Sequence, residues 1–247
     1  MLKVFVINLA TSSARRERVS ARLNELGVEF ELFEAVDGRK EPHPLFARYD
    51  DDLRVRYRRN ALSNGELGCF SSHFLMWQHC VALNQPLIVM EDDVVISPEF
   101  IEARSIADKQ IERLHFIRLA GTGVHRRPFI TLATIGQFDL VDYIRGPTGA
   151  LCYAIHPSAA KAFIKHGNTW YMAVDDYMDR YWCHHIDCYA LLPYTVTVGD
   201  NESDIARLPK TKRSLGATIT HELFGRLERL RMAFYRVFRK VNGSRHI

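Results

Sequence analysis

Long hydrophobic runs are missing from this sequence of 247 residues. No stretch reaches the roughly 18 apolar residues that a helix needs to cross a bilayer. The apolar run within residues 1–8 is also too short for a secretion signal. Repeats and low-complexity linkers are absent as well. We therefore expect a globular protein without a membrane-spanning segment.

Cysteine is scarce, and its spacing contains no C-x-x-C pair. The chain has five cysteines, and an odd number argues against a closed framework of disulfides. Reduced thiols are typical of cytoplasmic proteins. The sequence therefore predicts a cytoplasmic location.

A strong overall charge is also lacking, because the formal net charge is only +4. Basic residues gather locally instead, at 54–59 and near the C-terminus. Such patches indicate a phosphate-bearing ligand or an anionic surface. They are not interleaved with a row of aromatic residues, so we expect no nucleic-acid partner.

The chain is long enough for one large domain with a short appendage. Hydrophobic residues make up 47% of it, which suits a protein with a substantial core. We expect the domain over residues 1–215 and a basic helical segment over 216–247.

Three consecutive carboxylates directly follow the apolar run at residues 86–90. A short unbroken apolar run predicts a strand buried on both faces of a parallel sheet, and the residues after such a strand face the ligand crevice. Glu91, Asp92 and Asp93 repel one another, and a divalent cation relieves that repulsion. The pattern favours a metal–diphosphate site over a solvated acidic turn.

Apolar strands and amphipathic helices alternate along the chain. Ser97 and Pro98 are expected to start one helix, residues 39–61 to form a surface excursion, and residues 121–136 a loop with a weak strand. Besides the strand that ends at Glu91, strands are predicted at 4–7, 28–32, 115–119, 149–155 and 188–192. The alternation predicts an α/β fold, a Rossmann-like and mostly parallel sheet with helices on both faces.

The helix after Ser63 has the spacing of a capping box, with Glu66 at its third position. Its stripe of Phe70, Phe74, Trp77 and Val81 is expected in the core. His73 lies at the margin of that stripe and is either a packed histidine or a ligand contact. Arginines 15, 16 and 18 begin an earlier helix, and they either reach a phosphate or lie in solvent.

A second acidic pair, Asp175 and Asp176, follows an aromatic stretch at 170–174. Acids suit a helix N-terminus, so Asp175 is either an N-cap or a functional carboxylate. The polar residues 200–205 are expected to form a loop that reaches back over a ligand.

The C-terminal segment has apolar residues at helical spacing from Leu223 to Val241, with arginines largely off that stripe. Seven Lys or Arg residues stand against two Glu between residue 222 and the end. A basic amphipathic helix of this kind binds an anionic membrane surface. The alternative is a terminal helix that docks its stripe on the domain.

Six short motifs occur in a fixed order over residues 4–176. They are Val6-Ile7-Asn8-Leu9 with Arg15-Arg16, Ala35-Val36-Asp37-Gly38, Gly65-Glu66-Leu67-Gly68-Cys69 with Ser72-His73, Met90-Glu91-Asp92-Asp93-Val94, Gly149-Ala150-Leu151-Cys152-Tyr153, and Val174-Asp175. The ordered set resembles glycosyltransferase family 25, the bacterial lipooligosaccharide and lipopolysaccharide glycosyltransferases that also include collagen galactosyltransferases.

The resemblance implies a GT-A type fold and an inverting enzyme that moves galactose or glucose from a UDP-hexose to lipooligosaccharide or lipopolysaccharide. The acidic strand end would stand as its D-x-D type motif, with Glu91 and Asp93 on a divalent ion, Mn²⁺ or Mg²⁺, and Asp92 beside the donor. The other expected donor contacts are Asn8, Leu9, Arg16, Asp37, Gly38, Ser72 and His73.

Inversion requires a carboxylate that deprotonates the acceptor hydroxyl on the face opposite UDP. Asp175 or Asp176 is the candidate base. The family pattern has one Asp where this chain has two, so the resemblance does not choose between them. Trp170 and Tyr171 are the candidate floor for the acceptor sugar. Such an enzyme would work as a peripheral protein on the inner face of the cytoplasmic membrane.

Two other functions are compatible with the acidic site. A sugar-nucleotide pyrophosphorylase also has a Rossmann-like sheet, but no Gly-rich, Lys-bearing phosphate loop lies near the first strand here. A non-catalytic, membrane-associated module that binds a sugar nucleotide would keep the fold without turnover.

Overall fold

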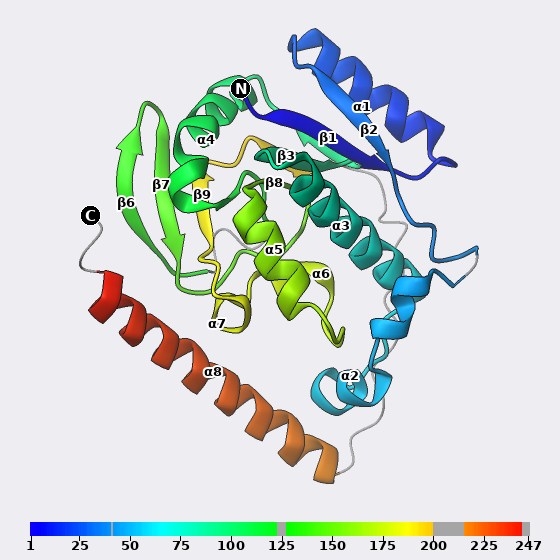
Figure 1. Cartoon of the computed structure of the whole chain (residues 1–247), viewed down its shortest axis with the longest axis vertical. Helices are drawn as coiled ribbons and strands as arrows, with labels where there is room; N and C mark the ends of the chain where they lie inside the picture. Colours follow the sequence, from blue (N-terminus) through cyan, green and yellow to red (C-terminus); the bar gives the residue numbers. More distant parts are fainter. Residues whose placement is uncertain (41, 123–126, 200–214, 244–247) are drawn as a thin grey trace.

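The structure is a computed structural model that describes residues 1–40, 42–122, 127–199 and 215–243. An eight-stranded sheet in the order β2-β1-β3-β8-β5-β9-β7-β6 forms its centre (Figure 1). These strands are β1 (Lys3–Asn8), β2 (Phe30–Glu34), β3 (Leu87–Glu91), β5 (Phe116–Arg118), β6 (Phe129–Ile135), β7 (Phe138–Tyr143), β8 (Cys152–Ile155) and β9 (Tyr189–Leu192). Two short strands, β4 (Val94–Ile96) and β10 (Val196–Val198), pair separately. The predicted loop at 200–205 lies outside the described residues.

Most strands of the sheet run in the same direction. β1 is parallel to β2 and β3, and β5 is parallel to β9. β8 lies between β3 and β5 and runs against both, and β7 runs against β9 and β6. The prediction of a mostly parallel sheet is confirmed, with β8 and β7 as the reversed strands in the described chain.

Helices cover both faces of the sheet, as predicted. α1 (Ser13–Glu25) and α4 (Phe100–Leu114) pack on one face, and α3 (Asn64–Leu83) and α5 (Pro157–His166) on the other. The side chains of β3 point alternately to the two faces of the sheet. Ile88 and Met90 pack in the core on the side of α1 and α4, whereas Leu87 and Val89 pack in the core on the side of α3 and α5. Glu91, two residues after Val89, therefore lies on the face that α3 covers.

The capping box of α3 forms as predicted. The Ser63 hydroxyl accepts a hydrogen bond from the Glu66 amide, and the Glu66 carboxylate accepts one from the Ser63 amide. Phe70, Phe74 and Trp77 are buried in the core. The capping box fixes where α3 begins and therefore where the side chains of its first turns lie.

Two local predictions differ from the structure, and a third is less detailed than the structure. Helix α4 begins at Phe100 rather than at Pro98, so Ser97 and Pro98 form the preceding turn. Residues 129–143 form the hairpin of β6 and β7 rather than a loop with a weak strand. The surface excursion contains the short helices η1 (Pro44–Arg48) and α2 (Asp51–Arg58), the second capped by the side chain of Asp50.

The C-terminal helix α8 (Leu215–Gly243) lies along one side of the molecule, beside α2 and α7 (Tyr181–His184) (Figure 1). Its inner face is aromatic and charged. Phe224 stacks on Tyr57 with 3.8 Å between ring centroids, and Glu228 pairs with Arg180. Farther along, Arg239 lies 2.9 Å from a carboxylate oxygen of Asp142.

Apart from Phe224, the described members of the apolar stripe of α8 point away from the domain. Phe234 and Phe238 are 72% and 68% exposed. The other exposed members of the stripe are Leu223, Leu227, Leu230 and Val237. The prediction of an amphipathic C-terminal helix is confirmed. Phe224 of the predicted stripe packs on the domain, whereas the exposed members do not, so the alternative in which the whole stripe docks on the domain is wrong. In the part of the chain that is described, no helix has both the length and the apolar character that spanning a bilayer requires.

Candidate active site

A pocket of about 340 Å³ opens at the carboxyl ends of β1, β2 and β3. Because β8 runs the other way, its first residues reach the same edge of the sheet. The pocket is lined by Ile7, Leu9, Arg15, Ala35, Val36, Asp37, Gly38, Arg39, Gly65, Glu66, Cys69, Ser72, His73, Glu91, Asp92, Asp93, Thr122, Gly149, Ala150, Leu151, Ala173, Val174, Asp175 and Val198. All six motifs of the sequence therefore meet in one place.

Two glycines hold the segment after β2 against α3. A Cβ atom at Gly38 would lie 1.9 Å from the Asn64 carbonyl oxygen, and one at Gly68 would lie 2.5 Å from the Val36 carbonyl oxygen. The Ser72 hydroxyl accepts a hydrogen bond from the Val36 amide at 2.9 Å. This close contact fixes Asp37 at the mouth of the pocket, where Arg39 pairs with it and holds its pKa below the usual value.

Asp92 is held from behind by Asn8. The side-chain amide of Asn8 donates a buried 2.6 Å hydrogen bond to Oδ2 of Asp92. Arg15, in the first turn of α1, lies 3.7 Å from the other Asp92 oxygen and 4.0 Å from Asp93. Burial raises the pKa of Asp92, and the contacts with Asn8 and Arg15 oppose that rise. Of the two arginines in the first motif, Arg15 lines the pocket, whereas Arg16 does not.

Asp93 has a buried oxygen, Oδ1, for which the described residues offer no hydrogen-bond partner. Burial, together with the nearby Glu91 carboxylate, raises the pKa of Asp93 to about 6. A buried carboxylate oxygen without a partner is costly unless a ligand or ion satisfies it. The acidic strand end therefore fits a cation.

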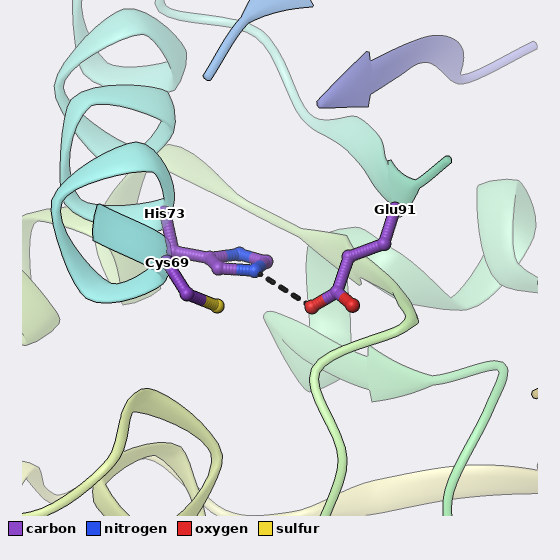
Figure 2. A group of neighbouring side chains, drawn as sticks. All are labelled: Cys69, His73 and Glu91. Carbon is purple, nitrogen blue, oxygen red and sulfur yellow. Dashed lines mark hydrogen bonds and ion pairs between the residues drawn. The ribbon is translucent and has the colours of Figure 1, made fainter. Parts of the chain in front are cut away.

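Glu91 is positioned by a chain of buried side chains. The Trp77 indole donates to the Tyr153 hydroxyl at 3.0 Å, and that hydroxyl lies 2.8 Å from Nδ1 of His73. Nε2 of His73 lies 3.1 Å from Oε1 of Glu91 (Figure 2). This network is satisfied when Tyr153 donates to Nδ1 and Nε2 of His73 donates to Glu91. His73 is thus both a packed histidine and part of the pocket.

The pocket has more acids than bases. Arg15 and Arg39 are its basic residues, and its acids are Asp37, Glu66, Glu91, Asp92, Asp93 and Asp175. A diphosphate entering such a pocket would meet repulsion from the acids. A bound divalent cation reverses that local charge.

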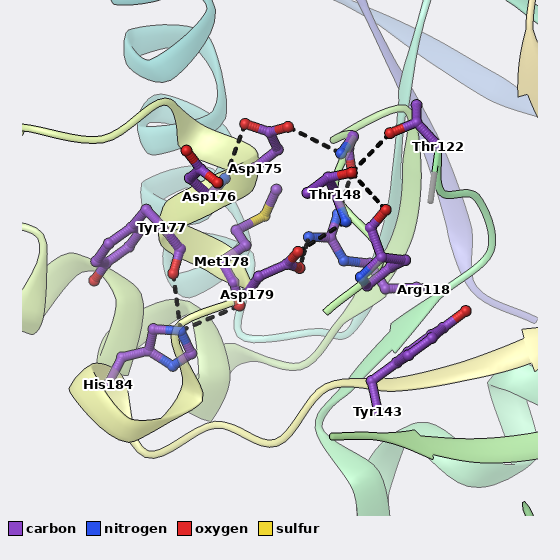
Figure 3. Close-up of polar contacts among 12 residues, drawn as sticks. Arg118, Thr122, Tyr143, Thr148, Asp175, Asp176, Tyr177, Met178, Asp179 and His184 are labelled. Carbon is purple, nitrogen blue, oxygen red and sulfur yellow. Dashed lines mark hydrogen bonds and ion pairs between the residues drawn. The ribbon is translucent and has the colours of Figure 1, made fainter. Parts of the chain in front are cut away.

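The structure separates the two consecutive acids of α6 (Val174–Met178). Asp175 lines the pocket, and its Oδ2 accepts a 3.0 Å hydrogen bond from the Gly149 amide at the start of the β8 segment. Asp176 does not line the pocket, and its carboxylate pairs with Arg58 of α2 at 3.2 Å. Figure 3 shows Asp175 turned toward the loop that bears Thr148. Neither acid caps the helix, because the N-cap is Ala173.

The loop that contacts Asp175 is held by a buried ion pair. Arg118 is fully buried, and its guanidinium donates to Asp179 at 2.7 Å and to the Gly149 carbonyl at 2.6 Å. The second oxygen of Asp179 accepts a 2.8 Å hydrogen bond from the Thr148 amide (Figure 3). Burial raises the pKa of Asp179 to about 6, against the opposing charge of Arg118. This pair was not predicted from the sequence.

The two aromatic residues expected under the acceptor lie outside the pocket. Trp170 is 1% exposed and stacks on Phe70 in the core with centroids 4.1 Å apart. Its burial argues against contact with a sugar ring. Tyr171 packs near Tyr57 and near Phe224 of α8. It belongs to the surface on which α8 docks.

Several pocket residues were not predicted as site residues. Cys69 lies one helical turn before His73, and that i, i+4 spacing was a readable signal. Glu66 was interpreted only as a helix cap, yet it also faces the pocket. Ala150 belongs to a motif of the sequence but was not named as a site residue, and Thr122 reaches the site through loop geometry, for which the sequence contains no comparable signal.

Comparison with known proteins gives three informative relatives. A Haemophilus influenzae protein named lipooligosaccharide biosynthesis protein lic2B is 32% identical over 93 residues, 37% of this chain and 34% of the relative. Mouse procollagen galactosyltransferase 2 is 32% identical over 103 residues, 40% of this chain and 16% of the relative. A mouse protein named inactive glycosyltransferase 25 family member 3 is 35% identical over 103 residues, 40% of this chain and 17% of the relative.

The matched stretch thus spans about a third or less of these relatives. Among solved structures, the inositol-1-phosphate CTP transferase from T. maritima aligns with a TM-score of 0.38 and 11% identity, over 83% of this chain and 92% of that one. The family model described as glycosyltransferase family 25 (LPS biosynthesis protein) matches residues 1–178. That range contains every pocket-lining residue except Val198. The resemblance of the six motifs is thereby confirmed, and the chain belongs to glycosyltransferase family 25.

Proposed function

We propose that this protein is an inverting glycosyltransferase that moves a hexose from a UDP-sugar to a sugar hydroxyl of lipooligosaccharide or lipopolysaccharide. The observation that supports it most is that Asp175 and the acidic end of β3 line the same pocket. Galactose is the preferred hexose in this proposal because one relative is named a procollagen galactosyltransferase. The name of the Haemophilus relative supports the lipooligosaccharide acceptor.

The donor is proposed to lie along the carboxyl ends of β1 and β2, with its diphosphate at the end of β3. Leu9, Asp37 and Gly38 line that side of the pocket, and Arg15 lies 3.7 Å from Asp92 at the end of β3. Glu91 and Asp93 would hold a divalent ion, Mn²⁺ or Mg²⁺. Such an ion neutralises the diphosphate and stabilises the departing UDP.

Asp175 is proposed as the general base. Its carboxylate takes the proton of the acceptor hydroxyl while that oxygen bonds to C1 of the hexose and the bond from C1 to UDP breaks. The Gly149 amide holds one Asp175 oxygen, and the Asp176 amide holds the other at 2.8 Å. These two bonds fix the carboxylate without neutralising it.

The direct test is release of UDP from UDP-galactose by the purified protein. It is measured with and without Mn²⁺, and with and without a truncated lipooligosaccharide. Transfer that requires both additions, with a product inverted at the anomeric carbon, supports the proposal. Exchange of pyrophosphate with UTP would instead indicate a sugar-nucleotide pyrophosphorylase.

A non-catalytic module is the second candidate, and the mouse relative named inactive is the observation that favours it. Such a module would bind a UDP-sugar without turning it over. Calorimetric binding of UDP-galactose with no UDP release, across a panel of acceptor sugars, would support this alternative over the transferase.

The outward face of α8 is proposed to bind an anionic membrane, which would place the protein on the inner face of the cytoplasmic membrane. Its docking face is occupied by contacts with the domain, so the apolar stripe is available to lipid. Arg226, Arg229 and Arg231 are exposed on the same helix, and basic residues beside an apolar stripe favour anionic lipid.

Vesicle sedimentation tests this surface. The double substitution Phe234→Ser with Phe238→Ser should release the protein from vesicles that contain phosphatidylglycerol. Ile130→Ser is the matched control, because Ile130 is also exposed, at 48%, but lies on β6. Equal binding of the wild-type chain and the double variant would contradict the proposal.

A further inference from the structure

The donor atoms nearest to Glu91 are not all oxygens. Among the described residues, the sulfur of Cys69, a ring nitrogen of His73 and a carboxylate oxygen of Glu91 all lie within 4.8 Å of one another. Figure 2 shows the first two on adjacent turns of α3 and the third at the end of β3, facing them. Asp93, the predicted partner of Glu91, is not part of this group.

The scaffold of these three side chains is rigid. Cys69 and His73 are four residues apart on α3, the spacing at which two side chains lie on one helix face and can bind the same ion. The capping box fixes the start of that helix. Glu91 ends a strand whose other residues are buried. Little side-chain entropy would therefore be lost on binding an ion.

His73 also has an outer partner of the kind that metal-bound histidines use. A ligating imidazole is oriented by a hydrogen bond at its other nitrogen. Here Nδ1 faces the hydroxyl of Tyr153, which the Trp77 indole holds in place. A neutral imidazole that binds a metal through Nε2 carries its proton on Nδ1. Because a hydroxyl can both donate and accept, the contact between Nδ1 and Tyr153 persists in that tautomer.

The position and charge of the cluster suit a divalent ion. All three residues line the pocket, so a coordination position is left open toward a ligand. A thiolate and a carboxylate together neutralise a charge of +2. A donor set of sulfur, nitrogen and oxygen favours Zn²⁺ or Co²⁺ over Mg²⁺, which prefers oxygen alone.

We propose that Cys69, His73 and Glu91 together bind a transition-metal ion of the Zn²⁺ or Co²⁺ type in the pocket. The inference deepens the proposed function by revising its metal site. The ion still lies at Glu91, but its other protein ligands are Cys69 and His73 rather than Asp93, and it is of the Zn²⁺ or Co²⁺ type rather than Mn²⁺ or Mg²⁺. It rests on that function only in placing an ion there, and no sugar donor is needed to test it.

Cobalt spectroscopy on the full-length, metal-free protein is the decisive experiment. Co²⁺ bound to a thiolate gives a sulfur-to-metal charge-transfer band in the near ultraviolet. We expect that band in the wild-type chain and its loss in Cys69→Ser. Adding Zn²⁺ should also remove the band, because Zn²⁺ displaces the bound Co²⁺. Cys183→Ser is the matched control, because Cys183 is also half-buried but lies on α7, away from the pocket.

Thiol labelling gives a second readout that does not depend on colour. Zn²⁺ should protect Cys69 from iodoacetamide, with mass spectrometry to locate the label, and Mg²⁺ at the same concentration should not. Cobalt binding without a charge-transfer band, or a band that survives in Cys69→Ser, would overturn the proposal. Either failure leaves UDP release by the protein, and thus the proposed transferase activity, to be judged separately.

Discussion

The amide of Gly149 donates a 3.0 Å hydrogen bond to Oδ2 of Asp175, across 26 residues of chain. This contact joins the loop before β8 to the first turn of α6. Its neighbour Asp176 makes no such contact and pairs with Arg58 instead. Two adjacent acids with the same chemistry are thus distinguished by their surroundings.

Asp175→Asn is expected to lower the transfer rate by roughly 10²–10⁴-fold, the usual loss when a general base is removed. Affinity for UDP should change little, because the amide keeps the size of the side chain. Asp176→Asn is the matched control and should keep near-normal turnover. Initial rates and calorimetric UDP binding for both variants check this, and equal turnover in the two would disprove the assignment.

Asp179→Ala is expected to cost about 3–5 kcal/mol of unfolding free energy, because it leaves the buried Arg118 guanidinium without its charge partner. Urea denaturation measures the loss. Removing both charges, with Arg118→Met and Asp179→Leu, should restore part of it. A single variant as stable as the wild type would show that water reaches Arg118.

His184 should make the protein less stable in acid. Burial lowers the pKa of His184 to about 3, and the neutral ring lies 3.2 Å from the carbonyl oxygens of Tyr177 and Met178 (Figure 3). The unfolded chain takes up this proton below about pH 6.5, whereas the folded chain resists it until about pH 3. The stabilising contribution is therefore complete above pH 6.5 and is lost as the pH falls.

The size of this effect is about 1.4 kcal/mol for each pH unit between those limits. Unfolding free energies of the wild type and of His184→Gln, measured from pH 7 to pH 4, should differ in slope by that amount. Parallel curves would show that His184 takes up its proton over the same pH range in the folded protein as in the unfolded chain.

Gly68→Ala should destabilise the protein by about 1–3 kcal/mol, although the same change normally favours a helix. The added Cβ would lie 2.5 Å from the Val36 carbonyl, which is backbone and cannot move alone. Gly225→Ala in α8 is the matched control, because nothing lies within 4 Å of its added Cβ. Thermal unfolding of the two variants should shift in opposite directions, and a stabilised Gly68→Ala would contradict the tight contact.

Local patterns allowed much of this fold to be predicted. The capping box, the apolar stripe of α3 and the buried run before Glu91 depend on residues close in sequence, and each forms as expected. The reversed direction of β8 was not readable, because strand direction depends on which distant strand it pairs with. For the same reason the sequence could not distinguish Asp175 from Asp176. Long-range contacts distinguish them, with Gly149 for Asp175 and with Arg58 for Asp176.

The face that α8 uses was predictable only in part. Periodicity identified its apolar stripe, and stripes of that kind usually pack on a domain. Here one member of the stripe, Phe224, packs on the domain together with the charged Glu228 and Arg239. Their partners lie in α2, just before α7 and in β7, respectively. These partners lie between about 50 and 170 residues away in the chain, beyond any local pattern.

The docking of α8 also fixes the orientation of the domain, and of its pocket, relative to the outer face of this helix. Stacked rings near one end of the helix, the Glu228–Arg180 pair farther along and ion pairs near the other end attach it at separated points. A helix that is held at several points along its length cannot rotate relative to the domain, as a helix attached at one point can. If its outer face binds a membrane as proposed, the pocket is presented at one fixed tilt and height, and an acceptor would have to extend to that height to be reached.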